Sequence, residues 1–186
     1  MAIIVVPPAA EPISLAEAKA LLRVEHSDDD AVIAALIAAA RGHVEALTRR
    51  ALMLQTRRFV RDEWPADGRL RLRAGPLRGV IAARVFDAGG EAHAIDVQRF
   101  VVDVAADIIA SPSWAMPAPG RSAAGIELDI ELGYGPLASD VPAPLRQALR
   151  MLLAHWYDNR GAVASGATLL PAGAAVLIAQ YRALSL

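Results

Sequence analysis

Histidines are the residues here that could most readily take part in metal or acid–base chemistry, and their spacing argues against both. His26, His43, His93 and His155 are scattered along the chain. No two of them combine with a carboxylate at metal-ligand spacing. His43 and His155 fall within predicted helices, where a structural role is the simpler interpretation. We therefore expect no metal site.

Other catalytic motifs are also missing. No serine sits in a Gly-x-Ser-x-Gly elbow, and no phosphate loop or dinucleotide fingerprint occurs. Asp103 and Asp107 flank a weak predicted strand and belong to no recognisable catalytic motif. The chain has no cysteine, which excludes disulfides and thiolate metal ligands. We expect no catalytic residue and no cofactor.

Charge is distributed unevenly along the 186 residues, although the net charge is only −1. Residues 1–40 carry two basic and six acidic side chains, whereas residues 41–84 carry eleven arginines and four acids. This polarity would orient like subunits head to tail. Nucleic-acid binding and two ordinary solvated faces are the alternatives.

The first eight residues are apolar, but they lack a basic leader and end in two prolines. A signal peptide is therefore not expected. The longest apolar run, residues 31–40, is about half as long as a membrane span requires. We expect no contact with a membrane.

Helix signals occur at both ends of the chain. Ser14 and Glu17 form a capping box that opens a helix ending near Val24. A second helix starts at residues 27–30, where three aspartates suit the helix macrodipole; a divalent-metal site is the alternative. Pro142 and Pro144 open a third helix.

Strand signals fill the middle of the chain. Residues 59–64 and 69–73 predict a hairpin around the turn at 65–68, with leucines on one face and arginines on the other. Further strands are expected at 80–86, 100–102 and 125–132. The acidic face of 125–132 would pair with the arginine-faced strands.

We therefore predict an α+β fold with a helical core and a β-rich insertion between the second and third helices. The expected parts are residues 1–53, the insertion 54–135, the third helix 136–161, and a hinge with a C-terminal segment at 162–186. The last segment is amphipathic. It is either a docking arm or a helix packed on its own domain.

Several segments, in this order, are similar to a known family: residues 12–19 (PISLAEAK), the acidic 28–30, Trp64-Pro65, 76–78 (PLR), 133–135 (GYG), 141–144 (VPAP) and 154–157 (AHWY). The chain resembles the head–tail connector (adaptor) proteins of tailed bacteriophages and of phage-derived gene transfer agents. The resemblance implies a ring of about twelve subunits beneath a portal, extending the DNA channel toward the tail. It supplies no catalytic residue.

The resemblance also implies partners and surfaces. The partners would be further copies of the chain, the portal protein, a stopper or tail-side neck protein, and DNA passing transiently through the channel. The particle neck would be the location, after assembly in the bacterial cytoplasm. Another neck component such as a stopper, or a small cytosolic enzyme with an unrecognised site, is the alternative.

The expected contact residues form two sets. The expected portal-docking residues are Leu169, Leu170, Pro171, Val176, Leu177, Tyr181 and Arg182. The expected inter-subunit or portal contacts are Asp28, Asp29, Asp30, Arg57, Arg58, Arg61, Arg69, Arg71, Arg73 and Trp114. Trp114 lies in a proline-rich loop, and packing into its own core is the alternative role.

Overall fold

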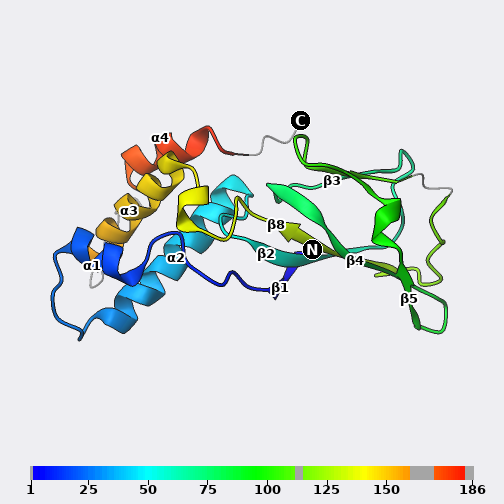
Figure 1. Cartoon of the computed structure of the whole chain (residues 1–186), viewed down its shortest axis with the longest axis horizontal. Helices are drawn as coiled ribbons and strands as arrows, with labels where there is room; N and C mark the ends of the chain where they lie inside the picture. The colour runs from blue at the N-terminus through cyan, green and yellow to red at the C-terminus, as the bar shows by residue number, and fades with distance from the viewer. Residues whose placement is uncertain (1, 112–114, 160–169, 183–186) are drawn as a thin grey trace. The chain divides into compact units, whose positions relative to one another are not determined.

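The computed structural model describes residues 2–111, 115–159 and 170–182. These residues fold as two compact units (Figure 1). The β unit falls within residues 1–9 and 54–133, and the helical unit within residues 10–53 and 134–186. Helices and antiparallel sheets are both present, so the predicted α+β class is confirmed.

The helical unit begins with the predicted capping box. α1 (Leu15–Leu22) is capped by Ser14, whose Oγ accepts a hydrogen bond from the Glu17 amide at 3.2 Å. The Glu17 carboxylate accepts one from the Ser14 amide at 3.0 Å. The remaining helices are α2 (Asp30–Thr48), α3 (Ala143–Asp158) and α4 (Ala172–Ala179).

Apolar stripes at helical spacing form the core of this unit. Ile33, Ile37 and Val44 of α2 are buried, as the 3.6-residue period predicts. α3 contributes a second stripe and α4 a third, and all three join one cluster. The buried members from the last two helices are Leu145, Ala148, Leu149, Leu152, Leu153, Ala174 and Ile178.

α2 is the one helix among the described residues whose length and composition would allow it to cross a membrane. The core helix of a soluble protein meets the same criteria. Its buried apolar side chains pack against α3 within the unit. It also carries Arg41, which bonds Glu11 at 2.7 Å and lies 3.7 Å from Glu45. Core packing thus accounts for the buried face of α2, which makes up 33% of its apolar stretch.

The β unit contains two antiparallel sheets. The larger one has the order β1-β2-β8-β4-β5, and the smaller one has the order β3-β7-β6. Their strands are β1 (Ala2–Val6), β2 (Gln55–Arg61), β3 (Arg69–Arg71), β4 (Leu77–Phe86), β5 (Ala92–Ile95), β6 (Val101–Asp103), β7 (Ile108–Ala110) and β8 (Ile126–Leu132).

β8 is the central strand of the larger sheet, and its alternation is as clear in the structure as in the sequence. Ile126, Leu128, Ile130 and Leu132 are almost completely buried. The acidic residues between them lie on the opposite face, because successive side chains of a strand alternate. β2 and β4 flank β8 on its two sides.

The predicted hairpin between residues 59–64 and 69–73 is wrong. β2 pairs with β1 and β8, whereas β3 pairs with β7 in the other sheet. The turn itself is present, with Gly68 at φ 65° donating to the Pro65 carbonyl. The end of β2 is instead tied to a distant loop, because the Asp62 carboxylate accepts a hydrogen bond from the Ala124 amide at 2.7 Å.

β1 is a strand that the sequence pattern does not reveal. Its five residues are uniformly apolar, so they show no alternation that would mark a half-buried strand. β1 nevertheless adds to β2 at the end of the larger sheet. Residues 2–9 therefore lie with the β unit rather than with the first helices.

Candidate assembly surfaces

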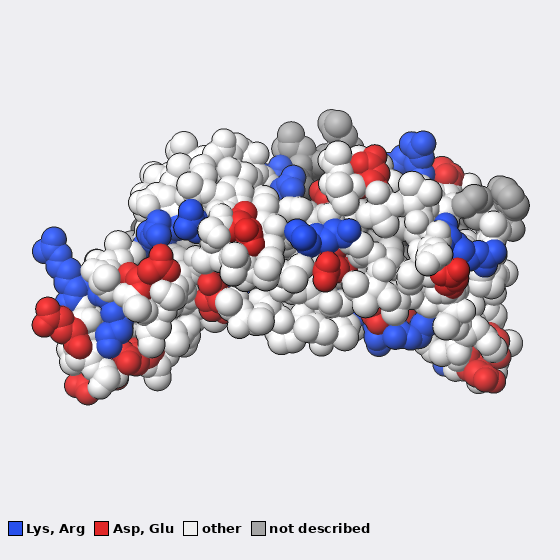
Figure 2. Space-filling view, in the orientation of Figure 1, with Lys and Arg blue, Asp and Glu red and all other residues white. Residues whose placement is uncertain are grey.

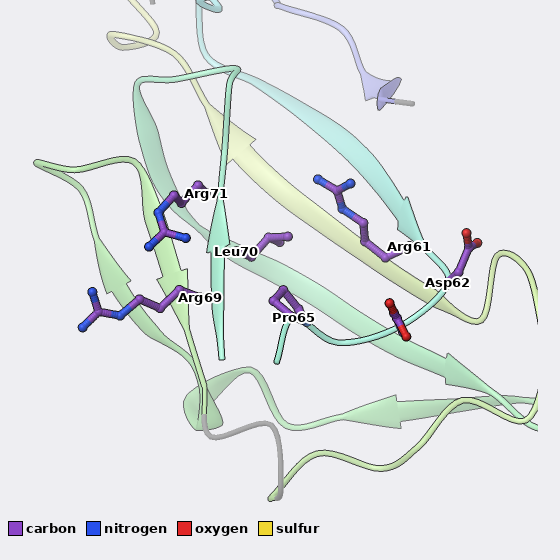
Figure 3. Close-up of a pocket in the computed structure, with 7 residues that line it drawn as sticks. Arg61, Asp62, Pro65, Arg69, Leu70 and Arg71 are labelled. Carbon is purple, nitrogen blue, oxygen red and sulfur yellow. The ribbon is translucent and has the colours of Figure 1, made fainter. Parts of the chain in front are cut away.

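Three of the predicted contact arginines lie around one hollow on the β unit. It forms where β2 ends and β3 begins, and has a volume of about 410 Å³. Figure 3 shows Arg69 and Arg71 extending to one side of β3 and Leu70 to the other. We call this hollow the arginine pocket; its lining residues are Arg61, Asp62, Glu63, Pro65, Arg69, Leu70 and Arg71.

Asp67 orders one side of the arginine pocket. Its carboxylate accepts hydrogen bonds from the Arg69 amide and from the Arg71 guanidinium, each at 3.0 Å. These two contacts, the amide first, lower the pKa of Asp67. Within the described part of the chain, the exposed guanidinium groups of Arg61 and Arg69 have no ion-pair partner. Such groups suit carboxylates or phosphates of another molecule.

Arg58, another of the predicted contact residues, is paired within the larger sheet. Its guanidinium bonds both carboxylate oxygens of Asp129 on β8, at 2.7 and 3.0 Å. Arg84 of β4 reaches the same carboxylate at 3.0 Å. The acidic face of β8 is therefore paired with arginines of β2 and β4. The expected pairing with the arginine-faced strands holds for the first of them, which overlaps β2, and is wrong for residues 69–73. The arginines of residues 69–73 face the opposite way from the buried Leu70 and Leu72.

This cluster makes the stability of the β unit sensitive to acid. Hydrogen bonds from Arg58 and then Arg84 outweigh burial and lower the pKa of Asp129. The stabilisation is present above the unfolded-state pKa, near 3.9, and is lost as the pH falls through the folded-state value. We expect Asp129→Asn to be less stable at pH 7 by about 1–3 kcal/mol and to lose less stability below pH 4. Thermal unfolding between pH 2.5 and 7 measures both, and parallel pH curves would contradict the assignment.

The acidic corner between α1 and α2 is largely satisfied internally. Asp30 forms an ion pair with Lys19 at 2.6 Å, and the Tyr157 hydroxyl donates a short hydrogen bond to Asp29. Asp28 alone of the three is almost fully exposed, with His26 3.8 Å away. Asp28 is therefore the best placed of the three aspartates for an outside contact. On the face seen in Figure 2, basic and acidic side chains lie next to each other.

The other predicted contact residues are dispersed. Arg57 donates to Gln55 within β2 at 3.0 Å, and Arg73 is exposed. Trp114 and Leu169 lie outside the described residues. α4 packs on α3, with Ala174 and Ile178 fully buried, so the C-terminal helix does pack on its own unit. Of the docking set, Leu170, Pro171, Leu177 and Tyr181 are half-buried, whereas Val176 and Arg182 are exposed.

Sequence reasoning missed one polar cluster, at the turn between β4 and β5. The ligand atoms of Asp87, Glu91 and His93 lie within 4.8 Å of one another. His93 Nε2 is 3.0 Å from Asp87, whose hydrogen bond raises the pKa of the imidazole. The turn predicted at residues 87–90 could have indicated that these three side chains come close together. The exposed Asp87–His93 ion pair accounts for the geometry without a metal ion.

The first of the comparisons with known proteins concerns the N-terminal third of the chain. Residues 12–72 match the model of a family described as phage gp6-like head–tail connector proteins. No curated protein gives a significant match.

Solved structures match nearly the whole chain. One chain in the neck of an empty gene transfer agent particle, reconstructed with C6 symmetry, is 26% identical, with a TM-score of 0.84 over 100% of this chain and 97% of that one. The chain therefore resembles head–tail connector proteins. It is thus a structural protein of the virion-neck type, not an enzyme.

Two further structures share the fold of this chain. A chain in the virion of a native gene transfer agent particle is 24% identical, with a TM-score of 0.84 over 100% of the connector and 97% of that chain. A chain in the neck of a native particle, reconstructed with C12 symmetry, is 24% identical, with a TM-score of 0.72 over 98% and 97% of the two chains.

Proposed function

We propose that the connector forms a ring of about twelve copies that sits beneath the portal, extends the DNA channel and joins head to tail. The observation that carries this proposal is the whole-chain likeness to the neck chain at 26% identity. Neck structures reconstructed with C6 and with C12 symmetry support a ring of several copies. The neck of a phage or gene transfer agent particle would be its location.

A closed ring needs two different surfaces on every subunit, because each copy meets its neighbour head to tail. The arginine pocket offers the exposed guanidinium groups of Arg61 and Arg69 on the β unit. Asp28 offers an exposed carboxylate on the helical unit. We assign these two surfaces to opposite sides of the contact between neighbouring copies, where a guanidinium and a carboxylate are complementary in charge and geometry.

DNA would pass through this ring without being held. Binding to the DNA backbone is driven by clustered cations, whereas the connector has a net charge of −1. Several of its arginines are also neutralised inside the sheet, above all Arg58 and Arg84 on Asp129. The contact with DNA would therefore be transient and independent of sequence.

The C-terminal segment is the proposed portal-docking surface. α4 is anchored to its own unit through Ile178 and through a hydrogen bond from Arg50 to the Tyr181 carbonyl at 2.9 Å. Val176, on the same helix, leaves 74% of its surface exposed. Val176 is therefore the aliphatic side chain that α4 would present to the portal.

We expect Val176→Glu to weaken portal binding by about tenfold or more, because a carboxylate would be desolvated in that contact. Thermal stability should stay unchanged, since Val176 contributes little to the core. Binding of purified full-length variant to portal protein, measured by biolayer interferometry, tests this expectation. Val32→Glu, an exposed valine on α2, is the matched control. Equal binding by both variants would remove α4 from the docking surface.

Crosslinking within purified particles tests the position in the neck. An adaptor in contact with the portal should give portal–connector crosslinks, and electron microscopy should show a ring of the connector at that level. A stopper would instead crosslink to the adaptor ring above it. Crosslinks to other neck proteins without any to the portal would contradict the proposed position.

A further inference from the structure

β1 leaves an exposed apolar edge on the larger sheet. It occupies one end of the strand order and pairs only with β2 among the described strands. Ile3, Ile4, Val5 and Val6 keep 42–54% of their surface exposed. Proteins usually protect such an edge with a charge, a proline within the strand or a very short strand. β1 has no charge, and its prolines follow the strand.

β5 is the opposite edge of the same sheet. Its residues Ala92, His93 and Ala94 are exposed, and Ile95 is buried. Small alanine side chains allow another backbone to approach closely. The edges of the smaller sheet, β3 and β6, have only three residues each, which limits how many hydrogen bonds a further strand could form there.

The charges near the two edges favour pairing of β1 with β5 over pairing of β1 with β1. β2, next to β1, carries Arg57 and Arg61. The β4–β5 turn and the residue after β5 carry Asp87, Glu91 and Asp96, of which Asp87 is paired with His93. Pairing β1 with β1 of a second copy would bring arginines toward arginines, whereas pairing β1 with β5 would bring arginines toward carboxylates. A contact between β1 of one copy and β5 of the next is also head to tail, so it repeats from copy to copy.

We propose that β1 of one copy pairs with β5 of the next copy, so that the larger sheet continues from subunit to subunit around the ring. This inference rests on the proposed ring. Main-chain hydrogen bonds would link the two strands, and the exposed aliphatic side chains of β1 would become buried against the neighbour. The contact adds a backbone-mediated interface to the ionic one at the arginine pocket.

Engineered disulfides test this pairing without competition from native thiols, because the chain has no cysteine. Particles would be assembled with full-length variants in place of the wild-type chain. Each variant would carry one cysteine on β1, at Ile3, Ile4 or Val5, and one on β5, at Ala92 or Ala94. Residues opposite each other on paired strands have Cβ atoms about 4.5–5.5 Å apart, close enough for some of these pairs to form a disulfide.

We expect at least one double variant to give a ladder of covalent multimers under mild oxidation, and the single variants to give none. The matched control places the second cysteine at Val101, which is 69% exposed on β6, and should give no ladder. Covalent dimers from a single β1 variant would show β1–β1 pairing and overturn the inference.

Two other outcomes separate this inference from the proposed function. A ring visible by electron microscopy, with no ladder from any β1–β5 pair, overturns the strand pairing and leaves the ring intact. Portal-containing particles that lack the wild-type connector contradict the ring itself. As a second measurement, Val5→Lys should lower incorporation into particles by about tenfold, whereas Val101→Lys should not. Equal incorporation by the two lysine variants would also overturn the pairing.

Discussion

Reversing the charges of Arg61 and Arg69 together should reduce incorporation of the connector into particles by about a hundredfold. Both guanidinium groups line the arginine pocket and have no ion pair within the described residues. In Arg61→Glu/Arg69→Glu, two favourable contacts with a neighbouring carboxylate become two repulsive ones, and like charges in contact cost several kcal/mol. Quantitative mass spectrometry of purified particles measures the incorporation.

The fold should survive this change, because both side chains are exposed and neither packs in the core. Arg99→Glu is the matched control, since Arg99 is also exposed on the β unit but lies outside the pocket. Adding Asp28→Arg to the double variant should partly restore incorporation if Asp28 is the opposing group. Wild-type incorporation of the double variant would remove the arginine pocket from the assembly interface.

Leu149→Ala should have the largest effect on stability, about 3 kcal/mol within a range of 2–5 kcal/mol. Leu149 is almost fully buried on α3 and lies in the core cluster shared with α2 and α4. Truncation removes three buried carbon atoms and leaves a cavity that surrounding helices fill only in part. The midpoint of thermal unfolding should fall by about 6–12 °C.

Leu137→Ala provides the matched control for this prediction. The chemical change is identical, but Leu137 keeps 62% of its surface exposed and lies outside the core cluster. Its unfolding midpoint should move by no more than about 2 °C. Similar shifts for Leu149→Ala and Leu137→Ala, measured by differential scanning calorimetry, would contradict the described core of the helical unit.

The parts of the fold that follow from local rules could be predicted from the sequence. Ser14 and Glu17 form a capping box because the motif satisfies its own helix end, without help from distant residues. β8 alternates over seven residues, so one face had to be buried. Pro142 opens α3, as the position of proline at a helix start predicts.

Strand pairing could not be predicted in the same way, because it depends on residues far apart in the chain. The turn at 65–68 forms, but it does not decide which strands pair. β2 instead pairs with β8, some seventy residues later, along seven aligned positions. β1 is uniformly apolar, so it shows no alternation that would predict a strand. Its pairing with β2 is also non-local.

The candidate surface was predictable only as a surplus of arginines. Composition does not distinguish Arg58, which is paired with Asp129, from Arg61, which lines the arginine pocket three residues later. The distinction arises because Arg58 lies opposite Asp129 in the register of β2 and β8. The same limitation applied to residues 28–30, where tertiary partners Lys19 and Tyr157 leave mainly Asp28 exposed.

The copy number of the connector relative to the portal, measured by quantitative mass spectrometry of purified particles, tests the central claim most directly. A ring of about twelve copies beneath a portal of matching symmetry predicts a ratio near one to one. Absence of the connector from particles that contain the portal would contradict the account.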